Sequence, residues 1–432
     1  MNFPRKKYVL VIPDGAGDLH RLEGLSPIAR ARTDYADFIA REGVSGLMKT
    51  LYEDLPKESL VAQLGMLGWE PHKYYPHGRA SCELLALEDI YLNANDLAFR
   101  TNFVRIEDQR LKSYNADYIH SEQAAPLINM LNVELRSEFP DFELYHNSDF
   151  RNTLVIRNAG VEPTLLRCPE PHESHGMYFD VRNLISGRDE TSHALAGRIN
   201  RYLTRAGSLI ASGTANMLAP WSASKVFQLP SFAAQTGFDG PVAIVGSMDF
   251  LMGISKAGKM NFFKVGNGRP DTDYRAKGAK VVELLRGGYE FVVCHVNAPD
   301  EASHGGNLAL KIETLQQIDR FVLGPIVEHF LDHRQELGGV MIVPDHYTNV
   351  SAYNSRTKRA EIHSSHPVPF ALWNDCEQDE VVRFSEDDAT NGKYAFPILN
   401  HLDLLPVLGV KANFPQQHLT TDNTDQIRIL SV

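Results

Sequence analysis

The chain has 432 residues, of which 43% are hydrophobic, and a formal net charge of -11. Because this length exceeds one ordinary hydrophobic core, we expect two domains. The negative charge argues against a nucleic-acid-binding protein, which needs a basic surface. It does not argue against a small anionic substrate, because bound cations can reverse the sign of the local electric field.

The cysteines and the N-terminus indicate the compartment. The four cysteines are widely separated and form no CxxC pair: Cys82, Cys168, Cys294 and Cys376. This usage is typical of free thiols in a reducing environment. The first apolar stretch, residues 8–13, is too short for a signal peptide, and no apolar run approaches the length of a membrane span. We therefore expect a cytoplasmic protein with neither a membrane nor a nucleic-acid partner; the sequence does not indicate its oligomeric state.

The predicted elements alternate between strands and helices. Short apolar runs predict buried strands at residues 8–12, 242–245, 291–296 and 340–343. Apolar positions at helical spacing predict helices at residues 34–41, 274–286 and 308–322. Thr33 or Asp34 would cap the first of these helices. The alternation predicts an α/β fold in which a mainly parallel sheet is flanked by helices.

The middle of the chain has a different pattern. It contains strand-like patches and helical pieces at residues 99–104, 153–157, 121–131 and 193–203. We interpret residues 93–205 as an inserted α+β domain, with residues 1–92 and 206–432 forming the core. An acidic stretch at residues 377–388 is interpreted as a solvated loop.

Seven residues have types and spacings suited to holding two divalent metal ions: Asp14, Ser59, Asp300, His304, Asp345, His346 and His363. Their short motifs follow predicted strands. In an open α/β sheet, side chains that follow parallel strands meet at the carboxyl edge. Carboxylates mixed with imidazoles favour manganese or zinc, with magnesium less suited.

Each motif also has a simpler interpretation. Asp300 and His304 would share one face of a helix, or they could be a capping aspartate and a surface histidine. Asp345 and His346, if extended, would point in opposite directions and serve different ions, or they could form a simple turn. His366 competes with the nearby His363 as a ligand.

Ser59 is the candidate nucleophile. A neutral serine is a poor metal ligand, but next to a divalent cation its hydroxyl can ionise and attack phosphorus. Without the other six residues, Ser59 would be interpreted as an exposed loop serine near Pro56.

In sequence, the chain resembles the archaeal-type cofactor-independent phosphoglycerate mutases of the alkaline phosphatase superfamily. The resemblance rests on residues 11–15, 59–71, 98–103, 295–305, 345–346 and 363–369, which follow the order of the motifs of that family. It implies a phosphatase-like core interrupted by a smaller transferase domain. It also implies that Ser59 takes the phosphoryl group covalently and returns it to another oxygen.

The same resemblance implies how the ligands divide between two ions. One ion would be held by Asp300, His304 and His363. The other would be held by Asp14, Ser59, Asp345 and His346.

The chain departs from the family pattern away from these ligands. Glu58 stands where the family usually has glycine, Tyr118 where it has arginine, and Met252 where it has lysine. Losing cationic side chains makes a pocket less suited to a small dianion. The remaining candidates for substrate binding are Arg79, Arg100, Arg151 and His172. Each of the arginines could instead form a surface salt bridge, and for Arg151 the two interpretations are about equally supported.

We therefore expect a phosphomutase-like phosphotransferase acting on a small phosphorylated or phosphonylated acid, with the metal chemistry kept and the substrate changed. Two alternatives stay open. One is a metal-dependent phosphohydrolase of the same superfamily, and the other is an inactive homologue that only binds.

Overall fold

The computed structural model describes residues 5–86, 90, 92–171, 174, 176–211, 213–350, 353–354, 359–360 and 362–410. The chain divides into two compact units. The core unit comprises Met1–Lys73, Leu229–Leu251 and Gly258–Val432, and the second unit comprises Tyr74–Gln228 and Met252–Ala257. The sequence placed the insertion at residues 93–205, and the second unit extends beyond that range at both ends.

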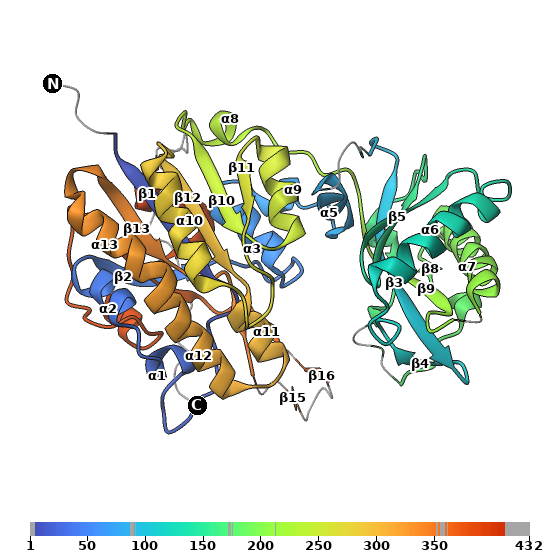
Figure 1. The fold of residues 1–432 in the computed structure, drawn as a ribbon, viewed down its shortest axis with the longest axis horizontal. Helices are drawn as coiled ribbons and strands as arrows, with labels where there is room; N and C mark the ends of the chain where they lie inside the picture. Colours follow the sequence, from blue (N-terminus) through green and yellow to red (C-terminus); the bar gives the residue numbers. More distant parts are fainter. Residues whose placement is uncertain are drawn as a thin grey trace. The chain divides into compact units, whose positions relative to one another are not determined.

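An eight-stranded sheet forms the centre of the core unit, in the order β11-β10-β12-β1-β13-β18-β2-β19 (Figure 1). Its strands are β1 (Lys7–Pro13), β2 (Val44–Lys49), β10 (Val242–Gly246), β11 (Asn261–Lys264), β12 (Phe291–Val296), β13 (Leu337–Ile342), β18 (Val368–Trp373) and β19 (Tyr394–Asn400). Only β18 runs against its neighbours, and every other pairing is parallel. The predicted mainly parallel sheet is confirmed.

Helices cover this sheet. Those of the core unit are α1 (Pro27–Arg30), α2 (Asp34–Arg41), α3 (Ser59–Met66), α8 (Phe232–Thr236), α10 (Tyr274–Arg286), α11 (Ala298–His304), α12 (Leu308–Ile318), α13 (Gly324–Asp332) and α14 (Leu404–Leu408). In addition, α4 (Pro71–Tyr74) and α9 (Asp249–Gly258) each include residues of both units.

One face of the sheet carries the main apolar core. Alternate strand residues such as Val9, Val292 and Val340 pack there against α2, α10, α12 and α13, which contribute side chains such as Leu285 and Phe330. Figure 1 shows α10, α12 and α13 over this side of the sheet. The predicted helices at residues 34–41 and 274–286 form with these bounds, because their apolar stripes match the face that they bury.

The start of α2 is capped differently from the prediction. The Thr33 side chain makes no capping hydrogen bond. Instead, Asp319 accepts hydrogen bonds from the backbone N–H groups of Tyr35 and Ala36 at 3.1 and 2.8 Å. Burial raises the pKa of Asp319 to about 7, although both hydrogen bonds act to lower it. Asp319 begins a π-helical turn, η4 (Asp319–Leu323), so this cap comes from a residue far away in sequence.

The sequence suggested that the acidic stretch at residues 377–388 is a solvated loop, but the structure shows that part of it is buried. Glu386 is buried, and the Ser26 hydroxyl donates a hydrogen bond to it. Burial raises the pKa of this carboxyl group. The interpretation of a solvated loop is therefore wrong at Glu386, because a partner distant in sequence stabilises it inside the core unit.

Lys311 of α12 is a fully buried cation. Its Nζ donates to the Asp18 carboxylate at 3.0 Å and to the carbonyl oxygens of Thr348 and Gly17 at 2.7 and 3.1 Å. Burial lowers the pKa of Lys311, and the nearby Asp18 carboxylate opposes this effect. These contacts join α12 to the loop that follows β1 and to the short strand β14 (Tyr347–Thr348).

Replacing Lys311 by methionine should lower the free energy of unfolding by about 3–5 kcal/mol, because Asp18 would keep a buried charge without its cation. Urea unfolding followed by tryptophan fluorescence measures this change, since Trp69 and Trp373 report from the core unit. Lys280→Met is the matched control, because Lys280 forms an i,i+3 pair with Glu283 near the surface and its ammonium group lies over the Phe263 ring. Lys280→Met should lower the free energy of unfolding by less than about 1 kcal/mol. Equal losses in the two variants would contradict the prediction.

The second unit has its own five-stranded sheet, in the order β4-β3-β6-β5 with β9 also pairing with β3. Its strands are β3 (Leu97–Glu107), β4 (Arg110–Ser113), β5 (Phe142–Ser148), β6 (Arg151–Ile156) and β9 (Met217–Ser224). Its helices include α5 (Ala80–Ala86), α6 (Ser121–Leu135) and α7 (Glu190–Ile210). α6 and α7 pack on this sheet around a separate apolar cluster, so the second unit has its own core.

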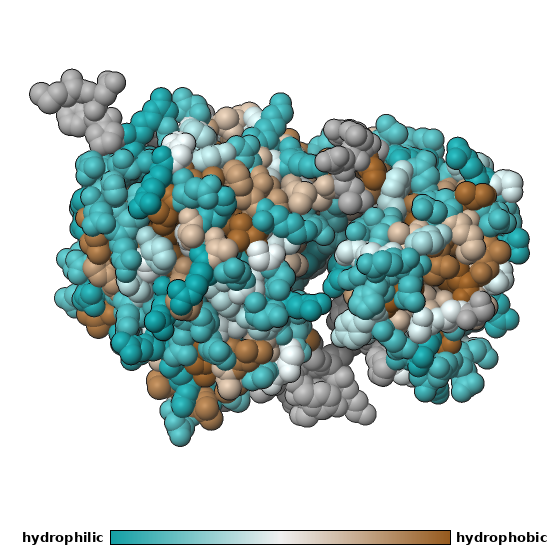
Figure 2. All heavy atoms as spheres, viewed as in Figure 1, coloured by the Kyte–Doolittle hydropathy of each residue, from teal (hydrophilic) through white to brown (hydrophobic). Residues whose placement is uncertain are grey.

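Hydrophilic side chains dominate the face of the molecule shown in Figure 2, with apolar residues lying among them. None of the described helices combines the length and apolar character that crossing a bilayer requires.

Candidate metal centre

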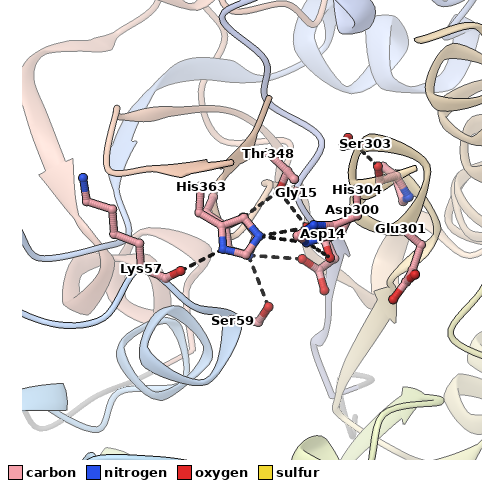
Figure 3. A network of polar contacts seen from close by, with 12 residues as sticks. Asp14, Gly15, Lys57, Ser59, Asp300, Glu301, Ser303, His304, Thr348 and His363 are labelled. Atoms are coloured by element: carbon pink, nitrogen blue, oxygen red, sulfur yellow. Dashed lines mark hydrogen bonds and ion pairs between the residues drawn. The ribbon is translucent and has the colours of Figure 1, made fainter. Parts of the chain in front are cut away.

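Three neighbouring parallel strands, β12, β1 and β13, deliver most of the predicted ligands to one edge of the core sheet. Asp14 directly follows β1. Asp300 and His304 lie on α11, which begins just after β12. Asp345 and His346 follow β13. Their convergence is the geometry expected at the carboxyl edge of a parallel sheet, and Figure 3 shows Asp14, Asp300, His304 and His363 directed toward one another.

One group of possible ligands is Asp14, Asp345 and His346, all of which are fully buried. The Nε2 atom of His346 lies 3.3 Å from Asp14 Oδ1 and 3.7 Å from Asp345 Oδ2. Two carboxylates buried beside one imidazole concentrate negative charge where water is excluded. A bound cation would neutralise that charge, so the residues present fit a divalent metal ion.

The other group is Asp300, His346 and His363. His363 Nε2 lies 3.4 Å from Asp300 Oδ1, and His304 Nε2 lies 3.3 Å from Asp300 Oδ2. Burial acts to raise the pKa of Asp300, but its hydrogen bonds with His304 and His363 hold that pKa well below the usual value. His304 Nε2 is also 3.1 Å from His363 Nε2. All the predicted partners of this ion therefore lie together, and His346 belongs to both groups.

Asp345 and His346 do not point in opposite directions, as extended chain would have placed them. The backbone at these two residues forms a bend rather than a strand. The bend brings both side chains to the same side, next to Asp14. Gly15 contributes by donating its backbone N–H to Asp345 Oδ1 at 3.0 Å.

Ser59 is the first residue of α3 and is only 5% exposed, so it is not an exposed loop serine. Its Oγ lies 3.2 Å from His346 Nε2. One turn further along α3, Gln63 donates a hydrogen bond from Nε2 to Asp345 Oδ2 at 3.3 Å. Sequence reasoning missed Gln63, although its spacing of four residues from Ser59, about one turn of a helix, was a usable signal.

His363, rather than its competitor His366, lies beside the other candidate ligands. His363 is in β17 (His363–Ser364), which pairs with β14 (Tyr347–Thr348). Its Nδ1 is 2.9 Å from the carbonyl oxygen of Lys57, which accepts the ring N–H and leaves Nε2 facing the other ligands. His366 is exposed and hydrogen-bonded to Ser364.

His295 is a second residue that sequence reasoning did not single out. It is fully buried near the end of β12, and its Nε2 lies 3.2 Å from Asp14 Oδ2. Burial lowers the pKa of His295 to about 4, so the imidazole is neutral near pH 7. Its polar side chain within the apolar run 291–296 was the available signal.

Gly15 must be a glycine for two reasons. Its φ of +62° lies in the left-handed region, which side-chain-bearing residues rarely adopt. A Cβ atom at this position would also lie 2.3 Å from Thr348 Oγ1 and 2.8 Å from Asp300 Oδ1. The absence of a side chain therefore lets the loop after β1 approach Thr348 and Asp300 closely.

The candidate substrate residues Arg79, Arg100 and Arg151 all belong to the second unit. Arg100 pairs with Glu83 at 3.0 Å and stacks on Trp221. Arg79 is half-buried. Arg151 is exposed over the Phe150 ring and forms no ion pair within the described part of the chain. His172 lies outside the described residues.

The amino-acid sequence was compared with protein-family models and with known proteins, and both comparisons match one family. Residues 40–216 match the family model described as 2,3-bisphosphoglycerate-independent phosphoglycerate mutase. The enzyme of that name from Methanosarcina acetivorans is 31% identical over 400 residues, covering 89% of this chain and 96% of the relative.

Solved structures share the fold. A protein from Pyrococcus horikoshii has a TM-score of 0.72 at 23% identity, covering 95% of this chain and 100% of the other. A cofactor-independent phosphoglycerate mutase from Thermoplasma acidophilum has a TM-score of 0.57 at 23% identity, covering 93% and 98%.

The extent of the match to the Methanosarcina acetivorans enzyme confirms the resemblance and the predicted enzyme class, because nearly the whole of both chains aligns. The chain belongs to the family of 2,3-bisphosphoglycerate-independent phosphoglycerate mutases.

Proposed function

We propose that this chain is a metal-dependent phosphomutase that moves a phosphoryl group between two oxygens of a small phosphorylated acid through Ser59. The observation that carries the proposal is the position of Ser59 Oγ, 3.2 Å from the one imidazole shared by both ligand groups. A hydroxyl placed there is buried at the start of a helix and faces the predicted cations. Membership of the phosphoglycerate mutase family supports the same chemistry.

In the proposed centre, Asp14, Asp345 and His346 hold one divalent cation, and Asp300, His304 and His363 hold the other. The mixture of carboxylates and imidazoles supports manganese or zinc. When bound, such cations lower the pKa of a nearby hydroxyl and stabilise the charge that develops on a transferring phosphoryl group.

The residues of the chain perform the remaining steps. Ser59 Oγ, having lost its proton, forms a bond to phosphorus while the bond between phosphorus and the ester oxygen of the substrate breaks, and that oxygen takes up a proton. The phosphoryl group later passes from Ser59 to a different substrate hydroxyl, which gives up its hydrogen as the bond from phosphorus to Ser59 breaks. Gln63 holds the Asp345 carboxylate in place, and the Lys57 carbonyl orients His363. The outcome depends on keeping the dephosphorylated acid bound and keeping water away from the phosphoserine.

The arginines proposed to contact the acid differ in how available they are. Arg151 is the strongest of the candidates, because its guanidinium is exposed and stacked without a carboxylate partner among the described residues. Arg100 is less available, because Glu83 already balances its charge. Tyr118 is 64% exposed, and it replaces a cation of the family pattern, which supports a substrate other than phosphoglycerate itself.

Four free cysteines, of which Cys82 and Cys294 are buried, support a reducing compartment such as the cytoplasm.

Phosphorus NMR of purified protein with manganese and candidate acids tests this function. The expected result is conversion of one phosphate ester into its isomer while free phosphate stays near background. 2- and 3-phosphoglycerate and phosphonylated three-carbon acids form the panel. Phosphate released as fast as substrate disappears would establish a hydrolase instead, and inactivity on the whole panel with no bound metal would favour the inactive homologue.

A further inference from the structure

We propose that Thr348 is a positioning residue that sets which ring nitrogen of His346 carries hydrogen and joins the two ligand groups to each other. The proposal rests on the metal centre described above. Thr348 lies two residues after His346 and is fully buried. Figure 3 shows it beside Gly15 and Asp300, at the edge of the ligand cluster.

Only one assignment of hydrogen-bond donors and acceptors fits the Thr348 hydroxyl. Thr348 Oγ1 donates its hydrogen to Asp300 Oδ1 at 2.7 Å. The same oxygen lies 3.1 Å from His346 Nδ1. A hydroxyl has one hydrogen, and a carboxylate can only accept. The contact with His346 must therefore be a donation from Nδ1–H to Thr348 Oγ1.

This arrangement leaves the lone pair of His346 on Nε2. Nε2 is the atom that faces Ser59 Oγ at 3.2 Å and Asp14 Oδ1 at 3.3 Å. A neutral imidazole binds a metal through its unprotonated nitrogen, and the partner of the other nitrogen decides which one that is. Thr348 therefore keeps His346 in the form that the centre requires.

The same hydroxyl also connects Asp300 with His346. Asp300 is confined to one ligand group, whereas His346 belongs to both. Through Thr348, the orientation of the Asp300 carboxylate is coupled to that of the shared imidazole. Loss of the hydroxyl should therefore weaken the binding of both cations rather than of one.

The surroundings hold the hydroxyl in place. The backbone of Thr348 pairs with His363 across β14 and β17, and its carbonyl oxygen accepts from Lys311 Nζ at 2.7 Å. On the opposite side, Gly15 approaches so closely that a Cβ there would lie 2.3 Å from Thr348 Oγ1. The side chain is therefore fixed from both sides.

The test compares three variants. Thr348→Val keeps the shape of the side chain and removes the hydroxyl, and Thr348→Ser keeps the hydroxyl. Thr314→Val is the matched control, because Thr314 is also buried in the core unit but its hydroxyl donates to the Lys311 carbonyl oxygen at 2.7 Å. The first readout is calorimetric titration of metal-free protein with manganese or zinc. The second is ¹⁵N NMR of the His346 ring in metal-free protein.

Thr348→Val should weaken binding of both cations by about 10–100-fold. Thr348→Ser should stay within about threefold of the wild type, and Thr314→Val should bind normally. The ¹⁵N spectrum should show hydrogen on Nδ1 of His346 in the wild type and in Thr348→Ser, and a mixture of forms in Thr348→Val.

Two results would overturn the role of Thr348: wild-type metal affinity in Thr348→Val, or hydrogen on Nε2 of His346 in the wild-type protein. The NMR measurement on the wild type and Thr348→Ser decides the matter even if Thr348→Val does not fold. If the wild type binds neither cation, the proposed metal centre fails, while the NMR measurement still answers the question about Thr348.

Discussion

Ser59→Ala should lower turnover by about 10⁴- to 10⁶-fold, the range expected when a nucleophile is removed from groups that act as a unit. The hydroxyl at the start of α3 is the only atom of that side chain that can bond to phosphorus, and alanine removes it without opening a large cavity. Metal content should stay close to that of the wild type, because Asp14, Asp345 and His346 remain. Turnover and bound metal are measured on the same preparation.

Ser45→Ala controls for removing a buried serine hydroxyl. Ser45 lies in β2 of the core unit and is 2% exposed. This variant should retain the turnover of the wild type. A Ser59→Ala protein as active as the wild type would exclude transfer through Ser59, whereas one that is inactive and metal-free would show that Ser59 is needed mainly to hold the cation.

His346→Ala should abolish tight binding of the cation that it holds with Asp14 and Asp345 and reduce turnover to background. The reason is that its Nε2, which carries the lone pair of the neutral ring, faces Asp14 Oδ1 at 3.3 Å and Ser59 Oγ at 3.2 Å. His304→Ala should lose only the other cation, because Asp14, Asp345 and His346 do not depend on it. Elemental analysis after dialysis against a fixed concentration of free metal measures both effects.

His366→Ala is the control for a nearby histidine that does not join the cluster, and it should keep the metal content of the wild type. The ring of His366 is exposed and bonded to Ser364. If His346→Ala kept two cations with unchanged affinity, the shared imidazole would not be a ligand, and the assignment of the centre would have to change.

The sequence predicted the sheet and the carboxyl-edge residues because both follow local rules. Apolar runs such as 291–296 have few alternatives to a buried strand, and a polar residue directly after a strand lies at the edge of the sheet. Asp14 and Asp300 were recognisable for this reason, and the spacing of Asp300 and His304 required only one turn of helix.

The contacts that hold these ligands in place were much harder to foresee. Asp319 caps α2 from far along the chain, and the buried Glu386 accepts a hydrogen bond from the distant Ser26. Gln63 and Thr348 are ordinary polar residues until the fold brings them next to ligands. Such pairings depend on three-dimensional packing, which no pattern within one segment contains.

The central place of β1 has a consequence for synthesis on the ribosome. Its neighbours β12 and β13 are made some 280 to 330 residues later, as the pairings Tyr8↔Phe291 and Lys7↔Leu337 show. The second unit, by contrast, is nearly contiguous and has its own apolar cluster. During translation the second unit is therefore available to fold first, whereas β1 can pair only after β12 and β13 have been synthesised. A nascent chain released before residue 363 would hold Asp14 and Ser59 but not the histidine that completes the cluster.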